Sequence, residues 1–518
     1  MCELCKQGQP QDHSGHDHSD HAETGSGMSG SRRTFMKTAA VAGAAAAATS
    51  LMSSGSASAQ AASVPEGTGT PGRRTLIRNG AVLSMDPDVG DFENADVLIE
   101  GSRIVEVGPN IDTGDAAVID ATGMIVMPGF IDTHHHQFET ALRSFLPNGL
   151  LFNDGKPHGA INYFDYILSK FSMAYRPEDV HISELFGSLS QLDAGVTTVM
   201  DVSQIHHSPE HSDAAIKGIM DSGRRTAFGY FEGHGDASKY PGDARRIKEQ
   251  YFSSDDQLVT MVMGGEIYLP DYEEAWKIGR ELDIPIAVHV VGSFGMAETF
   301  DKLADAGQIG PDNIFIHMTG MTDKGWQATR DAGAAVSLAV PIEMNMRHGM
   351  PPILKTLEMG VQPSLSTDVE CTMTADFFTQ MRSAMTLQRA LVNQAALSGD
   401  ENPPELLTAR DVIRFATVQG ARDLKLDGKV GTLTPGKEAD IILLDATAIN
   451  VAPLNNVPGA VVTLMERNNV DTVLVGGKVR KWQGEILDAD IPKLRGELEA
   501  SRDYLFEAAG VERDLFRD

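Results

Sequence analysis

The middle of the chain alternates short apolar runs with longer segments whose apolar positions recur at helical spacing. Strands that are apolar on both faces and separated by amphipathic helices are typical of a parallel sheet covered by helices. Eight such units between residues 128 and 430 have the size of a closed barrel. The pattern predicts an α/β fold, a (β/α)₈ TIM barrel. The eight runs of strand length read IVMPGFIDT, GVTTVMDVS, RRTAFGYFE, LVTMVMGGE, IPIAVHVV, NIFIHMT, AAVSLAV and VQPSLSTDV.

An open, doubly wound sheet is the alternative arrangement of the same units. Dinucleotide-binding sheets of that kind carry a G-x-G-x-x-G turn directly after a strand. None of the eight runs is followed by such a turn. The barrel is therefore the preferred fold.

Two clusters of shorter strands flank the barrel. In residues 74–127 and again in residues 431–483, apolar and polar residues alternate between Asp, Gly and Asn turns. Neither cluster is large enough to fold alone, so we expect them to pair into one small β-sandwich domain built from both ends of the chain. Residues 484–518 have helical spacing and many charges, which predicts a C-terminal helical tail.

Residues 1–59 are predicted to be a leader and signal peptide rather than part of the fold. Residues 31–60 read SRRTFMKTAAVAGAAAAATSLMSSGSASAQ and resemble a twin-arginine export signal, with cleavage expected after Ala59. The apolar stretch is too short and too weakly hydrophobic for a stable membrane span. We therefore expect the twin-arginine export machinery as a partner and a periplasmic or secreted location.

The segment ahead of this signal is rich in Cys and His. Cys2 and Cys5 have C-x-x-C spacing, and several imidazoles follow closely. Thiolates and imidazoles at this density can bind a transition metal, but one Cys pair is a weak zinc-finger pattern. The segment has two interpretations, a metal-binding site or a long polar leader. The imidazoles belong to His13, His16, His18 and His21.

The composition and net charge limit the kinds of partner that we expect. The 518 residues are 42% hydrophobic, which is enough for a large core, and their formal net charge is −29. Phosphate binding needs a surplus of Lys and Arg, so nucleic acid is excluded as a partner. Cys371 is the one cysteine outside the leader, so a disulfide framework is excluded for the main body. A small-molecule substrate and a homo-oligomer remain compatible with these numbers.

Polar residues stand at the ends of four predicted strands. His134 and His136 close the first, and because side chains two apart on a strand point the same way, both can reach one cation. His289 closes the fifth strand, His317 the sixth and Asp368 the eighth. A barrel gathers these strand ends on one face. Imidazoles with one carboxylate suit Zn²⁺, which is preferred, and also Fe²⁺ or Mn²⁺.

The PGFIDTHHH start, the histidines of strands five and six, the Asp of strand eight and the late GTLTPGKEADIILLD strand pair together resemble the amidohydrolase superfamily, near its cytosine-deaminase and chlorohydrolase-like branches. The resemblance implies one divalent metal held by His134, His136, His289 and Asp368. It also implies attack by a metal-bound hydroxide on an sp² carbon. Asp368 would shuttle the proton, and His317 would donate a hydrogen bond to the water or the developing oxyanion.

One position departs from the pattern. Deaminases of this branch carry a proton-shuttling Glu three residues after the strand-five histidine, where this chain has Gly292. Glu343, just past strand seven, and Glu266, at the end of strand four, are candidate replacements as catalytic residues. If Glu266 reached the centre, it could instead bridge a second metal held with His289 and His317.

Three functions stay open at this point. The loss of the shuttle Glu favours hydrolysis of C–N bonds in amides or cyclic amides, where Asp368 alone can carry the proton. An aminohydrolase or dechlorinase of a heterocycle is the first alternative. A non-catalytic periplasmic metal-binding protein is the second, although a binding site has no need of a proton carrier such as Asp368.

Overall fold

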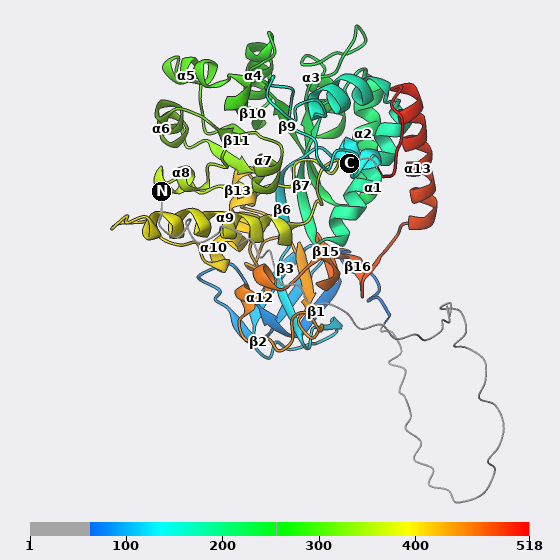
Figure 1. Cartoon of the computed structure of the whole chain (residues 1–518). Coiled ribbons are helices and arrows are strands. Elements are labelled where there is room, and N and C mark those ends of the chain that lie inside the picture. Colours follow the sequence, from blue (N-terminus) through cyan, green and yellow to red (C-terminus); the bar gives the residue numbers. More distant parts are fainter. Residues whose placement is uncertain (1–62, 255, 517–518) are drawn as a thin grey trace, which may run out of the picture. The chain divides into compact units, whose positions relative to one another are not determined.

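The computed structural model describes residues 63–254 and 256–516. The central part of the chain forms an eight-stranded parallel sheet in the order β13-β12-β11-β10-β9-β8-β7-β6 (Figure 1). The sheet closes on itself, because the backbone of Asp368 exchanges hydrogen bonds of 2.9 Å with His134 and His136. The predicted barrel is confirmed. Its strands are β6 (Phe130–His135), β7 (Val196–Ser203), β8 (Arg225–Tyr230), β9 (Val259–Gly264), β10 (Ile286–Val291), β11 (Asn313–Thr319), β12 (Ala335–Leu338) and β13 (Ser364–Leu365).

Helices connect the barrel strands and surround them (Figure 1). The barrel helices are α1 (Pro177–Asp193), α2 (Pro209–Ser222), α3 (Ala244–Tyr251), α4 (Tyr272–Glu281), α5 (Ala297–Asp305), α6 (Asp323–Ala332), α7 (Val340–Asn345), α8 (Ile353–Glu358), α9 (Phe377–Leu397), α10 (Ala409–Arg414) and α11 (Gly420–Asp423). Short 3₁₀ or π turns are η2 (Gln137–Leu142), η3 (Phe164–Phe171), η4 (Ser172–Ala174), η5 (Gly292–Phe294), η6 (Phe415–Gln419) and η7 (Arg467–Asn469).

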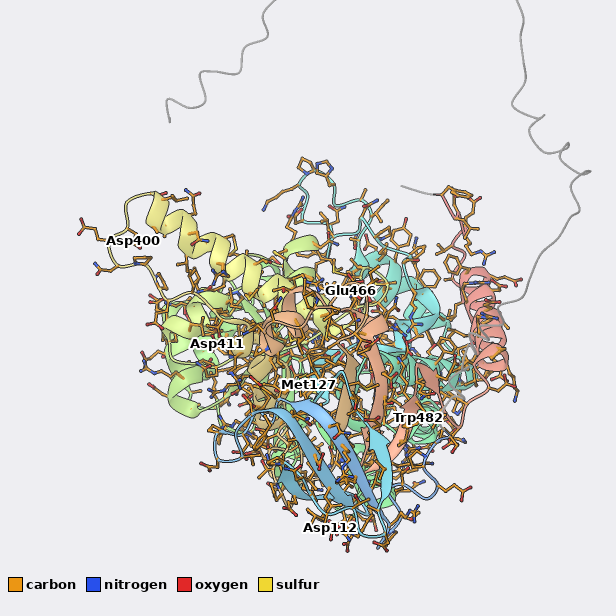
Figure 2. All side chains as sticks on the ribbon, turned by 90° about the horizontal axis from the view of Figure 1, so that it is seen from below. Asp112, Met127, Asp400, Asp411, Glu466 and Trp482 are labelled. Atoms are coloured by element: carbon orange, nitrogen blue, oxygen red, sulfur yellow. The ribbon has the colours of Figure 1, made fainter. Side chains whose placement is uncertain are left out.

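The two ends of the described chain pair into a second, mixed sheet (Figure 2). Its strands run in the order β17-β16-β15-β14-β5-β1-β2-β3, with β4 beside β1. The antiparallel pairing of β5 with β14 joins the N-terminal and C-terminal halves, and both halves contribute to one separate apolar core. The strands are β1 (Arg74–Val82), β2 (Phe92–Glu100), β3 (Arg103–Gly108), β4 (Ala117–Asp120), β5 (Met124–Pro128), β14 (Ile441–Asp445), β15 (Val470–Val475), β16 (Lys478–Trp482) and β17 (Glu485–Ile486), and α12 (Val457–Thr463) follows β14.

A buried ion pair fastens this sheet to the barrel. Nε of Arg225, at the start of β8, donates to Oδ2 of Asp440 at 2.9 Å, and its Nη2 donates to Oε2 of Glu438 at 2.6 Å. Asp440 directly precedes β14 and also accepts the backbone N–H of Gly476. The side chain of Arg225 is 1% exposed and that of Asp440 is 2% exposed, so this pair is buried and its geometry is fixed by several hydrogen bonds.

The C-terminal segment forms one long helix, α13 (Ile491–Ala508), which packs against α1. Phe506 contacts Phe145 and Phe171 with ring centroids 5.4 and 5.0 Å apart. This helix therefore supports the segments that follow the first barrel strand. Among the described helices, none is both long and apolar enough to cross a bilayer. The predicted export signal and the Cys/His-rich leader lie outside the described residues.

Seven of the eight apolar runs predicted as barrel strands contain one of the observed strands, and the first run overlaps β6. The first run is divided in two. Its beginning forms the end of β5 in the mixed sheet, and the chain enters β6 of the barrel after Gly129. A β-carbon on Gly129 would lie 2.2 Å from the side chain of Thr197, so the passage between the two sheets requires glycine.

Candidate active site

Five of the seven residues predicted to carry the chemistry meet at the carboxyl ends of the barrel strands. His134 lies in β6 and His136 directly follows it, while His289 and His317 lie in β10 and β11. Asp368 comes just after β13. Parallel strands in a barrel present these ends on one face, which is why residues more than 200 positions apart become neighbours.

Three imidazole nitrogens and one carboxylate oxygen surround a common point. Nε2 of His134 lies 2.9 Å from Nε2 of His136 and 3.1 Å from Nε2 of His289. Oδ1 of Asp368 lies 3.7 and 3.6 Å from the first two of these nitrogens. Ligand atoms bound tetrahedrally at about 2.0–2.1 Å from a cation are about 3.3 Å apart, so the four positions fit one metal ion.

Two of the imidazoles form hydrogen bonds through Nδ1, and these bonds orient the lone pair on Nε2 toward the common point. Nδ1 of His136 donates to the carbonyl of Val202 at 3.0 Å, and Nδ1 of His289 donates to Oε1 of Glu266 at 2.5 Å. With Nδ1 protonated in each ring, the neutral Nε2 carries a lone pair. Burial, together with the neighbouring imidazoles, holds the pKa of His134 and His136 well below 6.5. These rings are therefore neutral, as metal ligation requires.

The two carboxylate oxygens of Asp368 face different histidines. Oδ1 faces the nitrogens of His134 and His136, whereas Oδ2 lies 3.6 Å from Nε2 of His317. Oδ2 is buried and has no hydrogen-bond partner in the described part of the chain. Burial raises the pKa of Asp368 to about 7, opposed by the charge of His289. The residue has a φ of +64°, a conformation that non-glycine residues rarely adopt and that is often found at functional sites.

Each of the two candidate glutamates contacts the Nδ1 atom of a histidine, on the side of the ring that is remote from the proposed metal position. Glu266 contacts Nδ1 of His289, the ring nitrogen remote from the metal position. Glu343 is fully buried, and its Oε1 lies 3.1 Å from Nδ1 of His317 and accepts the backbone N–H of Ala339. Burial raises the pKa of Glu343 well above 4.5, with a further rise from Asp368.

The loop that follows β10, the fifth barrel strand, leaves no space for a glutamate at position 292. A β-carbon on Gly292 would lie 2.7 Å from the carbonyl oxygen of Thr319 and 2.9 Å from Cα of Gly320. Both contacts are with backbone atoms, which cannot rotate away. The departure from the deaminase pattern is therefore part of how the loops after β10 and β11 pack together.

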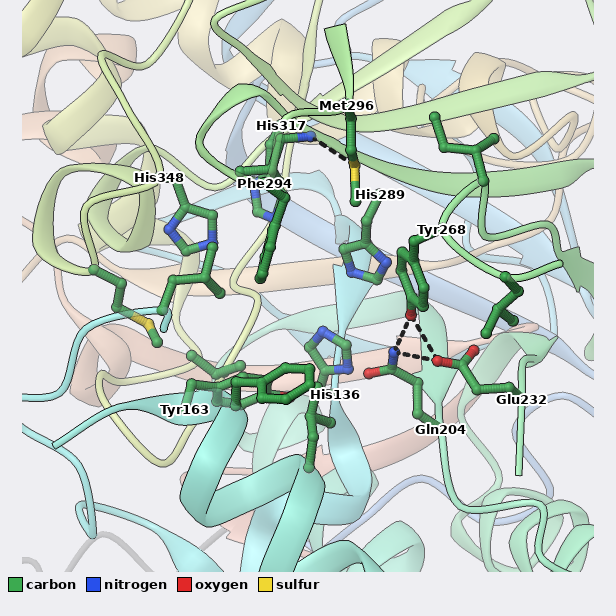
Figure 3. A pocket seen from close by; sticks show the side chains of 18 of the residues that line it. His136, Tyr163, Gln204, Glu232, Tyr268, His289, Phe294, Met296, His317 and His348 are labelled. Atoms are coloured by element: carbon green, nitrogen blue, oxygen red, sulfur yellow. Dashed lines mark hydrogen bonds between the residues drawn. The ribbon is translucent and has the colours of Figure 1, made fainter. Parts of the chain in front are cut away.

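A cavity of about 910 Å³ opens onto these residues (Figure 3). His136, His289, His317 and Asp368 form part of its wall. Most of the remaining lining is aromatic or aliphatic, which is typical of a small-molecule site. These apolar residues are Leu151, Tyr163, Phe164, Leu168, Met173, Ile267, Leu269, Val291, Phe294, Met296, Met346 and Val369.

Several polar lining residues were not among the candidates from the sequence. His348 lies beside His317, with ring centroids 4.7 Å apart, and Glu232, Gln204 and Tyr268 form a hydrogen-bonded group. Glu232 follows the third barrel strand, the kind of position that identified the other candidates, so the same argument could have found it. Gln204 and Tyr268 belong to βα loops, whose course the pattern of the chain does not predict.

The sequence pattern of the amidohydrolase family matches residues 125–480, which is more than half of the chain. This chain belongs to the amidohydrolase family. The matched region runs from β5 of the mixed sheet, through the whole barrel, to β16.

Amidohydrolases with curated functions resemble the chain over most of their length. The 5'-deoxyadenosine deaminase of Methanosarcina acetivorans is 28% identical over 455 residues, which are 84% of this chain and 99% of that protein. The 5-methylthioadenosine/S-adenosylhomocysteine deaminase of Thermococcus kodakarensis is 28% identical over 422 residues, which are 78% of this chain and 93% of the relative.

Solved amidohydrolase structures share the fold. An adenosine deaminase from Xanthomonas campestris, crystallised with bound zinc, superposes with a TM-score of 0.73 at 22% identity and covers 85% of this chain and all of its own. A triazine hydrolase from an Arthrobacter species has a TM-score of 0.72 at 21% identity, covering 83% of this chain and 99% of its own.

Proposed function

We propose that this protein is a metal-dependent hydrolase that cleaves a C–N bond of an amino-substituted heterocycle, releasing ammonia. The observation that carries this proposal is the convergence of the Nε2 atoms of His134, His136 and His289 with Oδ1 of Asp368 in the wall of the cavity. The deaminases among the relatives support the deaminase alternative over amide or lactam substrates.

The donor set favours zinc over iron or manganese. Three neutral imidazoles and one carboxylate are common zinc ligands, and the bound zinc of the structurally similar adenosine deaminase supports the same choice. A divalent cation at this position, when bound, would lower the pKa of a water molecule toward 7 and so supply a nucleophile at neutral pH.

Asp368 is the proton carrier in this proposal. Its Oδ2 is buried, directed at the cavity wall beside His317 and without a partner among the described residues. It would accept a proton from the attacking water as the C–O bond forms, and return that proton to the leaving nitrogen as the C–N bond breaks. The ring carbon gains the oxygen, and the amino group departs as ammonia.

His317 is positioned to interact with the developing charge. Its Nδ1 is held by Glu343, so that Nε2 faces Oδ2 of Asp368 and the cavity. Glu266 and Glu343 then act as positioning residues that orient His289 and His317, which replaces the direct proton transfer considered for them from the sequence. Since Glu266 contacts the outer nitrogen of His289, one metal is favoured over a pair bridged by Glu266.

The test compares Asp368→Asn with the wild type on a panel of aminopurines, aminopyrimidines and aminotriazines, with ammonia release as the readout and bound zinc measured by mass spectrometry. We expect wild-type turnover that is lost after chelation and regained with zinc. The variant should lose at least 10²-fold in kcat and retain much of its metal. Wild-type protein that binds zinc but releases ammonia from no member of the panel would overturn the proposal in favour of a non-catalytic metal-binding protein.

A further inference from the structure

We infer that Glu232, together with Gln204 and Tyr268, forms a substrate anchor that binds hydrogen-bond donors, and that the cavity selects neutral or cationic heterocycles over anionic ones. The inference rests on the proposed function for the reaction, but the binding preference can be measured without turnover. It assigns a role to a group of residues that the chemistry at Asp368 does not use.

Glu232 is a buried carboxylate with one oxygen free. Its Oε1 accepts the hydroxyl of Tyr268 at 2.6 Å and Nε2 of Gln204 at 3.0 Å (Figure 3). Its Oε2 is buried and has no hydrogen-bond partner within the described residues, although Glu232 lines the cavity. A buried carboxylate oxygen without a donor is costly, so a donor from a bound molecule would stabilise it.

Gln204 adds a second acceptor to the same subsite. Its Nε2 donates both to Glu232 and, at 3.2 Å, to the hydroxyl oxygen of Tyr268. The carboxylate accepts and cannot donate, so this contact fixes the nitrogen end of the amide toward Glu232. In Figure 3 the amide oxygen points away from Glu232, toward the side on which His136 lies. Both free polar atoms of the group are therefore acceptors, which match amino, imino or hydroxyl groups of a substrate.

The charge of the cavity disfavours anions. Its described lining contains no Lys or Arg, and of its two carboxylates Asp368 would be balanced by the metal that it is proposed to bind, which leaves the charge of Glu232. Burial and the nearby charge of Glu266 raise the pKa of Glu232, while hydrogen bonds from Tyr268 and Gln204 lower it. A phosphate or carboxylate that the substrate placed beside Glu232 would face a like charge in a place of low dielectric, with no Lys or Arg of the described lining as a partner. An ammonium or a neutral donor would meet no such penalty.

The lack of Lys and Arg in the lining predicts which of the substrates named for its relatives this chain prefers. 5'-Deoxyadenosine carries no ionised group at its sugar end, whereas S-adenosylhomocysteine carries both a carboxylate and an ammonium group there. The apolar rings and thioethers of the lining suit the unsubstituted end, and no cationic side chain of the described lining matches the carboxylate. We therefore expect neutral members of this substrate class to be preferred.

The experiment uses zinc-loaded protein at pH 8 and ring-matched compounds that differ in charge: 5'-deoxyadenosine, 5'-amino-5'-deoxyadenosine and adenosine 5'-monophosphate, with a second set of neutral, amino-bearing and carboxylate-bearing aminotriazines. Ammonia release gives kcat/KM, and calorimetry gives Kd independently. We expect the wild type to favour the neutral and cationic members over the anionic one by at least about tenfold, and Glu232→Gln to reduce this ratio by about tenfold. Glu249→Gln removes an exposed carboxylate on α3 and should leave the ratio unchanged.

Two results would overturn the inference: equal Kd values for the anionic and neutral members in the wild type, or a ratio in Glu232→Gln that matches the wild type. Tyr268→Phe removes one donor to Glu232 at a half-exposed position but keeps the carboxylate, so it should retain the preference against the anionic member, which separates the effect of the charge from a general disturbance of the subsite. If no compound is turned over, the proposed function fails, and the calorimetric ratios alone decide for or against Glu232.

Discussion

Oε1 of Glu266 lies 2.5 Å from Nδ1 of His289, and Oε2 of the same carboxylate lies 3.2 Å from the backbone N–H of His289. One fully buried carboxylate thus holds both the ring and the main chain of a predicted metal ligand. Although burial lowers the pKa of His289, the Glu266 carboxylate raises it, and the result is a net rise. The pair therefore makes the imidazole more basic and fixes its orientation, two properties that strengthen metal binding.

Glu266→Gln should weaken metal binding without removing a metal ligand. An amide oxygen still accepts from Nδ1 but no longer supplies a charge, so we expect zinc affinity to fall 10- to 100-fold. Activity should recover when zinc is added in excess. Competition with a chromogenic chelator measures the affinity, with Glu249→Gln as the matched control. An unchanged zinc affinity would show that Glu266 does not act through His289.

Gly292→Glu should not create a better deaminase. The new β-carbon would lie 2.7 Å from the carbonyl of Thr319, so the strand-five loop must move before the carboxylate can reach the cavity. We expect a loss of about 1–3 kcal/mol in the free energy of unfolding and no gain in kcat. Gly292→Ala should show most of the same destabilisation, because the first carbon causes the clash.

Gly108→Ala is the control for this pair, since a β-carbon there meets no atom within 4 Å. Denaturant titration of the three variants compares their midpoints. A Gly292→Glu variant as stable as the wild type and faster on aminopyrimidines would contradict the packing argument and show that the loop accommodates a shuttle residue.

The barrel and the convergence of the candidate ligands could be predicted because they depend on local pattern and topology. Apolar runs give strands, and a closed barrel brings their ends together, which is enough to assemble His134, His289 and Asp368. The orientation of side chains behind the site could not be predicted in this way. Glu266 and Glu343 were recognised as candidates, but whether they face the metal position or the outer ring nitrogens depends on contacts between loops. The sequence likewise does not predict that the backbone of Thr319 occupies the space that a β-carbon at position 292 would need.

Arg225 is predicted to hold the mixed sheet on the barrel. Arg225→Met would leave Asp440 and Glu438 without their buried cation, and we expect a loss of about 3–5 kcal/mol in the free energy of unfolding. Arg225→Lys keeps the charge but loses the two-pronged contact, so its loss should be smaller. Denaturant titration followed by tryptophan fluorescence measures both. Equal stability of Arg225→Met and the wild type would show that the β5–β14 pairing alone is sufficient.

Export remains a prediction from residues outside the described structure. Replacing both Arg32 and Arg33 by Lys should retain the protein in the cytoplasm of a host that has the twin-arginine pathway, while the wild type is exported and loses residues 1–59. Immunoblotting of cell fractions and the intact mass of the mature protein provide the readout. Export of the double-lysine variant at the wild-type level would contradict the prediction.

Asp423 should make stability fall as the pH rises. It lies in α11 with 3% of its surface exposed, and burial raises its pKa to about 7, although hydrogen bonds from Ser364 and Gln419 lower it. A carboxyl whose pKa is higher in the folded than in the unfolded state has no effect below pH 3.8. It destabilises progressively between pH 3.8 and 7, and fully above that range, by about 4 kcal/mol at most.

Asp423→Asn keeps the acceptor that Gln419 contacts at 2.8 Å and removes the charge. We therefore expect this variant to be more stable than the wild type at pH 8 and equally stable near pH 4, with the difference growing between these values. Denaturant midpoints at several pH values measure it, and Asp427→Asn, at an exposed position nearby, should show no such trend. A stability difference for Asp423→Asn that is constant across this range would mean that the carboxyl does not titrate there.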